Sequence, residues 1–179
     1  MGSFVEVTAS MAAPLRGEKR WAYLTRARTI RVATTCEDGS IHLSPLWFVV
    51  HEKTIYVPID VAGRHAVNFD AGRPMAALVD SGEEYATVMG VRIVGKMERV
   101  EDPKLFERLQ QLLFDKYFYV GHPYADPCFQ FGNAVGRKYY ALRAEKMVGW
   151  DSRETTTPQV TESHVLPDFV TDRRLNDKK

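Results

Sequence analysis

The chain has 179 residues, of which 45% are hydrophobic and 26% charged, which suits one domain with a single core. Its net charge of +1 provides no bulk attraction to nucleic acid or to an anionic membrane. The sequence has no apolar run near the ~18 residues that span a bilayer. We expect no secretory leader, because no basic region followed by an apolar stretch opens the sequence. Cys36 and Cys128 are too isolated for a disulfide framework or a zinc knuckle, so we expect a cytoplasmic protein. We expect an N-terminal arm over 1–13, a folded domain over 14–153 and a polar tail over 154–179.

Periodicity and turn residues predict short strands separated by a few helices. Alternating and β-branched residues favour strand segments over 29–36, 40–50, 54–59, 75–79, 88–100, 138–144 and 147–150. Apolar stripes and capping residues favour helices over 14–28, 62–71, 103–117 and 126–134. The helices do not alternate regularly with the strands, which argues against a doubly wound parallel sheet. We therefore expect a mainly β (α+β) fold, a mostly antiparallel barrel of about six strands with a few packed helices.

Four positions carry more detailed expectations. Asp38-Gly39 is a strong signal for a hairpin turn between two strands. Pro58 cannot donate to a ladder, so its strand should end there or lie at a sheet edge. Gly95, in the middle of an alternating strand, suggests a bulge or a bend. Asp102 is suited to cap the helix that begins at the next residue.

The segment 60–74 has the pattern of an anion site. Gly63 and Arg64-His65 follow a strand and open a short helix, where backbone N–H groups favour a phosphate and Arg64 adds a charge-assisted fork. This pattern indicates a small phosphorylated ligand, with a redox cofactor as the first choice. The alternative interpretation of Arg64 and His65 is a solvated helix start. Asn68 is equally suited to contacting the ligand and to cross-linking the short helix.

An ordered set of short motifs covers residues 20–151. The motifs are Ser44-Pro45-Leu46-Trp47-Phe48-Val49, Ile55-Tyr56-Val57, Gly63-Arg64-His65-Ala66-Val67-Asn68, Arg73-Pro74-Met75-Ala76-Ala77-Leu78-Val79, Gly90-Val91-Arg92-Ile93-Val94-Gly95 and Glu145-Lys146-Met147-Val148-Gly149-Trp150-Asp151. Together they resemble the pyridoxamine 5'-phosphate oxidase-like superfamily, the FMN-binding split barrel. The segment 45–49 looks most like the actinobacterial flavin/deazaflavin oxidoreductase branch.

This resemblance implies a six-stranded antiparallel split β-barrel that forms a homodimer with two cofactor sites at the interface. It implies a phosphate near Arg64-His65 and an isoalloxazine ring along the second barrel strand, partly over its backbone. The implied cofactor-binding residues are Ser44, Pro45, Leu46, Trp47, Arg64, His65, Asn68 and Trp150.

Several positions depart from the family pattern. His65 stands where lysine is usual, and a neutral histidine carries no charge. Gly90 stands where the true oxidases tend to have glutamine, and His42 and Trp47 lie near positions of their basic phosphate ligands. These departures argue against pyridoxamine phosphate oxidation itself.

Individual side chains on the strands leave alternatives open. Both faces of the strand 41–50 become apolar after Pro45, so we expect it to be buried on both sides, with Trp47 in the core rather than at a ligand. Ser44 is better placed to hydrogen-bond a ring edge. Trp150 could stack on a flavin or pack across the dimer. Arg92 is expected to be solvated, with a phosphate contact in the second subunit as the alternative.

The leading functional hypothesis is an oxidoreductase that uses FMN or coenzyme F-420 for hydride transfer with a small organic substrate. We favour FMN slightly, because Arg64, His65 and Arg73 are few cations for the polyanionic tail of F-420. The alternative is a non-enzymatic flavin- or heme-binding protein, in which His42 or His65 could ligate iron, although hydrogen bonding is the favoured role for both. We expect no metal site, no nucleic acid and no membrane partner, and no residue is identified as catalytic.

Overall fold

The computed structural model describes residues 12–83, 87–118, 122–123 and 136–154. Most of the expected N-terminal arm, nearly all of the C-terminal tail and the expected helix over 126–134 lie outside the described residues. Within these ranges, no helix is both long enough and apolar enough to cross a membrane.

Eight strands form one sheet in the described part of the chain, and all of their pairings are antiparallel. They are β1 (Ala13–Pro14), β2 (Ile30–Thr35), β3 (Ile41–Leu46), β4 (Val49–His51), β5 (Thr54–Asp60), β6 (Met75–Ser81), β7 (Met89–Arg99) and β8 (Arg137–Asp151). The spatial order is β3-β2-β6-β7-β8-β5-β4, with β1 paired to β8. Only β1 and β4 are shorter than six residues, which leaves six longer strands. The expected antiparallel α+β fold is confirmed.

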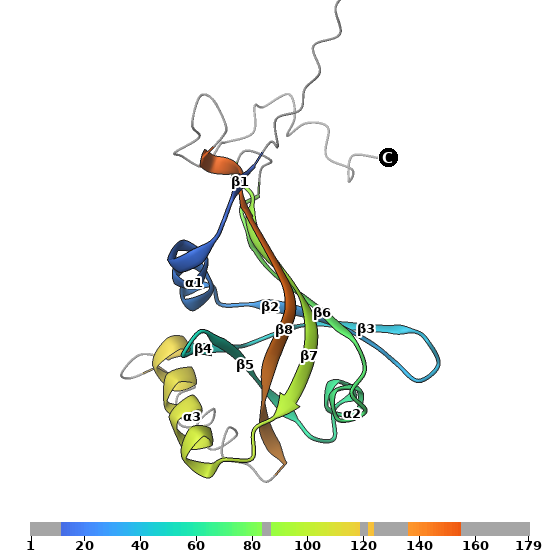
Figure 1. Cartoon of the computed structure of the whole chain (residues 1–179). Helices are drawn as coiled ribbons and strands as arrows, with labels where there is room; N and C mark the ends of the chain where they lie inside the picture. The colour runs from blue at the N-terminus through green and yellow to red at the C-terminus, as the bar shows by residue number, and fades with distance from the viewer. Residues whose placement is uncertain (1–11, 84–86, 119–121, 124–135, 155–179) are drawn as a thin grey trace, which may run out of the picture.

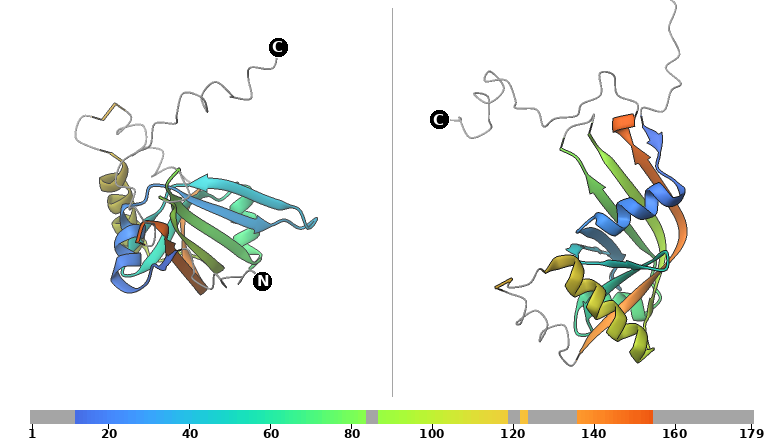
Figure 2. Two further views of the ribbon diagram at one scale, coloured as in Figure 1. Left: turned by 90° about the horizontal axis from the view of Figure 1, so that it is seen from above. Right: turned by 90° about the vertical axis from the view of Figure 1, so that its left-hand side faces the viewer.

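The sheet curls because its two ends are consecutive in the chain. β3 is the first strand of the spatial order and β4 the last, yet only Trp47 and Phe48 join them. The two edges therefore meet at this connection, and the sheet closes there into a half-barrel that stays open elsewhere (Figures 1 and 2). The single strand expected over 40–50 is wrong for this reason.

The edge position of β3 also corrects its expected burial. Ile41 is 64% exposed and Leu43 is 62% exposed, so in the isolated chain one face of this strand is open rather than buried. In the described part of the chain, β3 pairs only with β2. Its outer N–H and C=O groups therefore have no ladder partner.

Three α-helices and one 3-10 turn pack around the sheet in the described ranges. They are α1 (Gly17–Arg26), α2 (Arg64–Asp70), α3 (Pro103–Tyr117) and η1 (Ser152–Glu154). α1 and α3 lie on one side of the curled sheet and α2 on the other (Figure 1). Asp102 caps α3 as expected, its carboxylate accepting from the Lys104 N–H at 2.9 Å. Pro14 belongs to β1, paired with Trp150, so the expectation that it opens the first helix is wrong.

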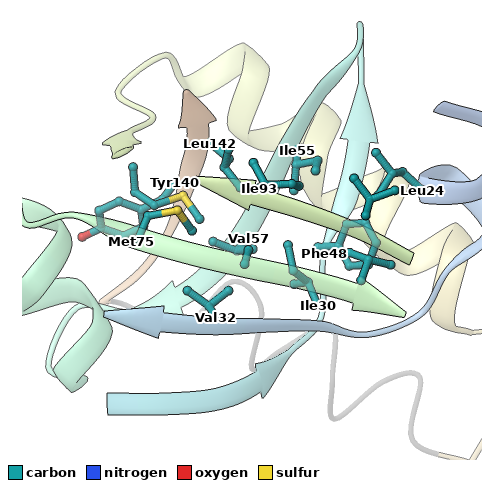
Figure 3. Close-up of a cluster of buried hydrophobic side chains, with 14 of the residues drawn as sticks. Leu24, Ile30, Val32, Phe48, Ile55, Val57, Met75, Ile93, Tyr140 and Leu142 are labelled. Carbon is teal, nitrogen blue, oxygen red and sulfur yellow. The ribbon is translucent and has the colours of Figure 1, made fainter. Parts of the chain in front are cut away.

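Hydrophobic side chains fill the inside of the curl. Val32, Phe48 and Ile93 are fully buried in a cluster to which β2, β5, β6, β7 and β8 contribute (Figure 3). A second cluster lies beneath α3, where Leu109 and Leu113 pack against Tyr139 of β8. Because packed interiors resist deformation, these clusters hold β2, β3 and α2 in fixed relative positions.

The local signals at turns and bulges agree well with the structure. Gly39 turns the hairpin between β2 and β3 with φ of +81°. At Gly95 the ladder between β7 and β8 shifts by one residue, so the expected bulge is confirmed. A Cβ at Gly95 would lie 2.1 Å from the Arg143 carbonyl oxygen, which explains why a side chain cannot fit there. The two closing strands expected near the end of the chain are one strand, β8, with Glu145 as its extra residue.

Pro58 lies inside β5 rather than at its end, because the strand continues to Asp60. On one side it stands opposite Tyr139 of β8. On the other side β4 pairs only with residues 54–56, so Pro58 faces no second ladder. Pro58 therefore lies at a local edge of the sheet, which is one of the two expected positions, although β5 as a whole is an inner strand.

Candidate functional site

Side chains from β2, from the residue that follows β2, from β3 and from α2 meet in what we call the β3–α2 cluster. Its members are Thr34, Cys36, Ser44, His65 and Asn68. The ladder places Val32 opposite Ser44 and Thr34 opposite His42, which brings the inner side chains of β2 and β3 under the first turn of α2. The cluster thus joins residues more than twenty positions apart in the sequence.

His65 lies in the interior of the cluster and is only 5% exposed. Its Nε2 atom is 2.7 Å from Ser44 Oγ, and its Nδ1 atom is 3.5 Å from Thr34 Oγ1. Burial, with a smaller contribution from the nearby His42 ring, lowers the pKa of His65 to about 4. The ring is therefore neutral near pH 7 and adds no positive charge for a phosphate.

Asn68 is 1% exposed and cross-links α2 to β2. Its Nδ2 atom donates to Thr34 Oγ1 at 2.8 Å and points to Cys36 Sγ at 3.7 Å. Of the two roles left open by the sequence, the structure shows the contacts of a helix cross-link.

Arg64 lies at the start of α2 with its side chain exposed. Among the described residues its guanidinium forms no ion pair and no hydrogen bond, although its charge contributes to lowering the pKa of Asp38. Arg73 differs, because it is partly buried and lies 3.8 Å from the Glu37 carboxylate. Arg64 is consequently the exposed cation of the 60–74 segment, while Arg73 Nη1 is buried without a hydrogen-bond partner among the described residues.

The segment from Ser44 to Trp47 follows the exposed edge of β3. Ser44 and Leu46 are half-buried, whereas Pro45 is exposed. Trp47 is 43% exposed and stacks on the Tyr117 ring at 4.5 Å. The expectation that Trp47 belongs to the core is therefore wrong for the isolated chain, because the connection between the sheet edges leaves one side of the indole open.

The end of α3 holds this connection in place, which sequence reasoning did not anticipate. The Lys116 ammonium donates to the Phe48 carbonyl at 2.9 Å, and the Phe48 N–H donates to Tyr117 Oη at 3.1 Å. Tyr117 in turn donates to the Arg28 carbonyl at 2.6 Å. Burial, with repulsion from Arg28, lowers the pKa of Lys116 to about 8, and burial raises the pKa of Tyr117 to about 12. The sequence signal for these contacts was the pair Lys116-Tyr117, two polar residues at the end of the apolar stripe of this helix.

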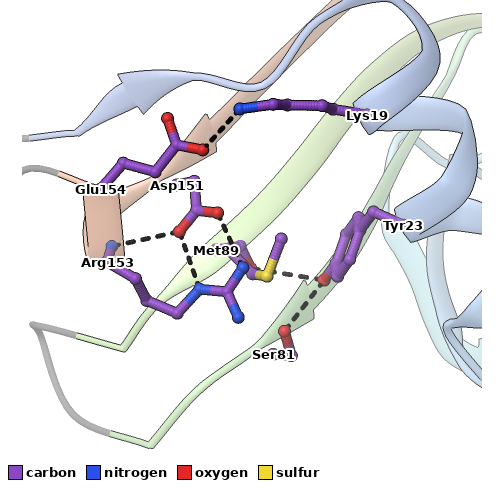
Figure 4. A network of polar contacts seen from close by, with 7 residues as sticks. All are labelled: Lys19, Tyr23, Ser81, Met89, Asp151, Arg153 and Glu154. Atoms are coloured by element: carbon purple, nitrogen blue, oxygen red, sulfur yellow. Dashed lines mark hydrogen bonds and ion pairs between the residues drawn. The ribbon is translucent and has the colours of Figure 1, made fainter. Parts of the chain in front are cut away.

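Trp150 lies on β8, and β2, β6 and β7 separate that strand from β3 in the sheet order. Its ring covers Gly90, where a Cβ would lie 2.7 Å from the indole. The polar network that follows it is shown in Figure 4, where Arg153 holds the buried Asp151 carboxylate at 2.9 and 2.7 Å. In one chain, Trp150 is therefore not brought to the β3–α2 cluster.

The remaining polar candidates do not assemble into a metal site. His42 is half-buried, with its ring centre 4.4 Å from that of His65. Arg92 is exposed on the outer face of β7, as expected. In the residues that the structure describes, no group of three or more His, Cys, Asp or Glu side chains could hold a metal ion.

The open edge of β3, the available Arg64 and a neutral cluster of donors between them could hold a flat polar ligand that carries an anionic group. A curled antiparallel barrel with this arrangement is of the split-barrel class. A family model described as pyridoxamine 5'-phosphate oxidase matches residues 18–151. The chain belongs to this family, within the FMN-binding split-barrel superfamily, and the resemblance read from the motifs is confirmed.

Solved structures of similar fold come from several bacteria. A conserved hypothetical protein of Mycobacterium tuberculosis is 25% identical with a TM-score of 0.72, covering 84% of this chain and 94% of that one. An FAD-binding protein of Mesorhizobium loti is 16% identical with a TM-score of 0.59, covering 78% and 96%. The heme storage protein of Vibrio cholerae is 14% identical with a TM-score of 0.60, covering 74% and 93%. No protein of curated function matches the sequence.

Proposed function

We propose that the protein is an oxidoreductase that binds FMN or coenzyme F-420 and transfers a hydride to or from a small organic substrate. Family membership supports a flavin, and the FAD-binding relative has the same fold. The bound cofactor would supply the hydride chemistry, while the protein binds, orients and shields it. No side chain is assigned as an acid or base, since hydride transfer itself requires none.

The observation that carries this proposal is the position of Arg64 beside the open edge of β3. Its unpartnered guanidinium would form a bidentate pair with a phosphate. The exposed backbone of Ser44, Pro45 and Leu46 would line the edge of the ring, in agreement with the unpaired side of β3. The neutral His65 and the buried Asn68 would act from behind this surface rather than on the phosphate.

We further propose a homodimer in which the cofactor lies between the subunits. Ile41 and Leu43 expose an apolar face on β3 that a second copy would cover. Trp150, which is far from β3 in the sheet order of its own chain, would then serve the cofactor site of the partner or pack across the interface. Cys36 is a free thiol, in keeping with the cytoplasm as the proposed compartment.

FMN is preferred over coenzyme F-420. The polyanionic tail of F-420 would require several exposed cations, whereas Arg73 is partly buried beside Glu37 and His65 is neutral. Arg64 alone suits a single phosphate group.

Heme binding without catalysis is the second candidate, suggested by the heme storage protein with this fold. His42 would be the iron ligand, because both ring nitrogens of His65 lie against hydroxyl groups of the cluster.

A visible spectrum of the purified native protein, followed by titration with FMN, F-420 and heme, tests these proposals. We expect a flavin spectrum or tightest binding of FMN. A Soret band would instead support the heme candidate. A colourless protein that none of the three titrates would contradict both.

A further inference from the structure

We infer that His65 is a positioning residue that makes the Ser44 hydroxyl a hydrogen-bond donor to an acceptor atom of the bound flavin. This inference rests on the proposed function. It follows the direction of the hydrogen bonds through the β3–α2 cluster, from the buried Asn68 outward to the edge of β3.

The direction is set at Asn68. Its Nδ2 atom can only donate, and it lies 2.8 Å from Thr34 Oγ1 and 3.7 Å from Cys36 Sγ. Thr34 Oγ1 therefore accepts from Asn68, and the hydroxyl hydrogen of Thr34 is left to donate elsewhere. Both residues are 1% exposed, so water does not compete at this end of the chain of bonds.

The hydroxyl hydrogen of Thr34 can be donated to His65. The Thr34 Oγ1 atom lies 3.5 Å from His65 Nδ1, a long contact, and within the described part of the chain it is the hydrogen-bond partner of that nitrogen. A neutral imidazole has one donor and one acceptor nitrogen. If Nδ1 accepts from Thr34, the proton of the ring is on Nε2.

The last step reaches Ser44. His65 Nε2 is 2.7 Å from Ser44 Oγ, so in this tautomer the N–H donates and the hydroxyl oxygen accepts. The hydroxyl hydrogen of Ser44 is then free, and among the described residues no other side-chain bond engages it. Ser44 lies half-buried on the open edge of β3, beside the residue that follows Arg64, where the proposed flavin binds. A lysine at position 65 would bring a positive charge to this edge of β3. The neutral His65 instead orients the Ser44 hydroxyl as an uncharged donor.

Asn68→Asp tests the direction, because a carboxylate of the same shape only accepts. It would take the Thr34 hydrogen, Thr34 would accept from Nδ1–H, and Nε2 would accept from Ser44. Nitrogen NMR of the full-length protein labelled at histidine, with His65 assigned by its loss in His65→Gln, reads the tautomer without any cofactor. We expect Nε2–H in the wild type and Nδ1–H in Asn68→Asp. Nδ1–H in the wild type, or the same tautomer in both proteins, would overturn the inference.

Flavin affinity tests the consequence at Ser44. We expect Ser44→Ala and Asn68→Asp each to weaken FMN binding about tenfold, the order of one hydrogen bond. The double variant should bind no more weakly than Ser44→Ala alone, because Asn68 acts through Ser44. If the losses of FMN affinity of the two single variants add in the double variant, Asn68 does not act through Ser44 and the inference is refuted. Gln111→Glu, on the exposed face of α3, controls for the added charge and should bind FMN normally.

Two further measurements cover the cases in which these variants or the flavin binding fail. If Asn68→Asp does not fold, Thr34→Val interrupts the same series of hydrogen bonds. Its loss of FMN affinity must then vanish in the Ser44→Ala background, and an additive loss would refute the inference. If the wild type binds no flavin, the proposed function fails and the Ser44 step fails with it. The histidine signals would still decide the chain of bonds from Asn68 to His65.

Discussion

Arg64 is the residue on which cofactor affinity should depend most, since its guanidinium is exposed and unpartnered within the described part of the chain. Arg64→Ala should weaken FMN binding by about 1.5–3 kcal/mol, the range for a hydrogen bond to a charged group. Calorimetric titration measures this directly. Arg108→Ala, which removes an exposed arginine from α3, is the matched control and should leave the affinity unchanged. Equal affinities for wild type and Arg64→Ala would show that the start of α2 does not hold the phosphate.

The low pKa of His65 should make the free energy of unfolding depend on pH in a specific way. Its pKa is about 4 in the folded protein and 6.5 as the ordinary value, so the unfolded chain binds more protons between these limits. The free energy of unfolding should therefore fall as the pH decreases from 6.5 to 4, by about 2.5 kcal/mol from this residue. Urea unfolding across this range, compared between wild type and His65→Gln, isolates the contribution. Parallel pH profiles for the two proteins would mean that His65 is not buried as a neutral ring.

Of the β3–α2 cluster, the sequence indicated Ser44, His65 and Asn68 but not Thr34, which lies between the last two. The strand, glycine and arginine before the short helix indicated Arg64 correctly as an exposed cation at its start. His65 is buried against Thr34 and Ser44. These residues are distant from it in sequence, and the pairing of β2 with β3 brings them close to it. No local pattern could reveal these partners.

At the scale of the element, the bulge at Gly95 determines how β7 crosses β8. A methyl group at this position would collide with the Arg143 carbonyl oxygen at 2.1 Å, and backbone cannot move aside as a flexible side chain would. Gly95→Ala should lower the free energy of unfolding by about 1–3 kcal/mol. Denaturant unfolding provides the measurement, with the exposed neighbour Lys96→Ala as a control that stays within about 0.5 kcal/mol. If Gly95→Ala is as stable as that control, the close approach of the two strands is wrong.

Elements with strong local signals were predictable, whereas those set by the closure of the barrel were not. Asp38-Gly39 and Asp102 marked a turn and a helix start that the structure contains. The break of the segment 40–50 at Trp47 and Phe48 has no such signal, because it arises where the first and last strands of the sheet meet. The apolar residues after Pro45 suggested a strand that is buried on both faces. In the structure they include the connection between β3 and β4, the two edge strands of the sheet.

For the whole molecule, the exposed face of β3 predicts association. Leu43 is 62% exposed in the single chain, and we expect the second subunit to cover it. Leu43→Glu would place a charge in that interface, so the variant should be monomeric where the wild type is dimeric and should bind FMN more weakly. Analytical ultracentrifugation separates the two states. Ala22→Glu, on the exposed side of α1, adds the same charge and should remain dimeric. A wild type that is monomeric at all concentrations would refute the proposed interface.

The most direct test of the central claim, that a flavin binds where β3 and the start of α2 meet, is a crystal structure of the protein with FMN. We predict the phosphate within hydrogen-bonding distance of Arg64 and the ring along the open edge of β3, with Ser44 donating to it. A different location is available on the same chain, a hollow of about 450 Å³ between β1, α1 and β8, lined by Arg16, Arg20 and Trp150 among others. FMN bound in that hollow, with Arg64 free, would contradict the claim.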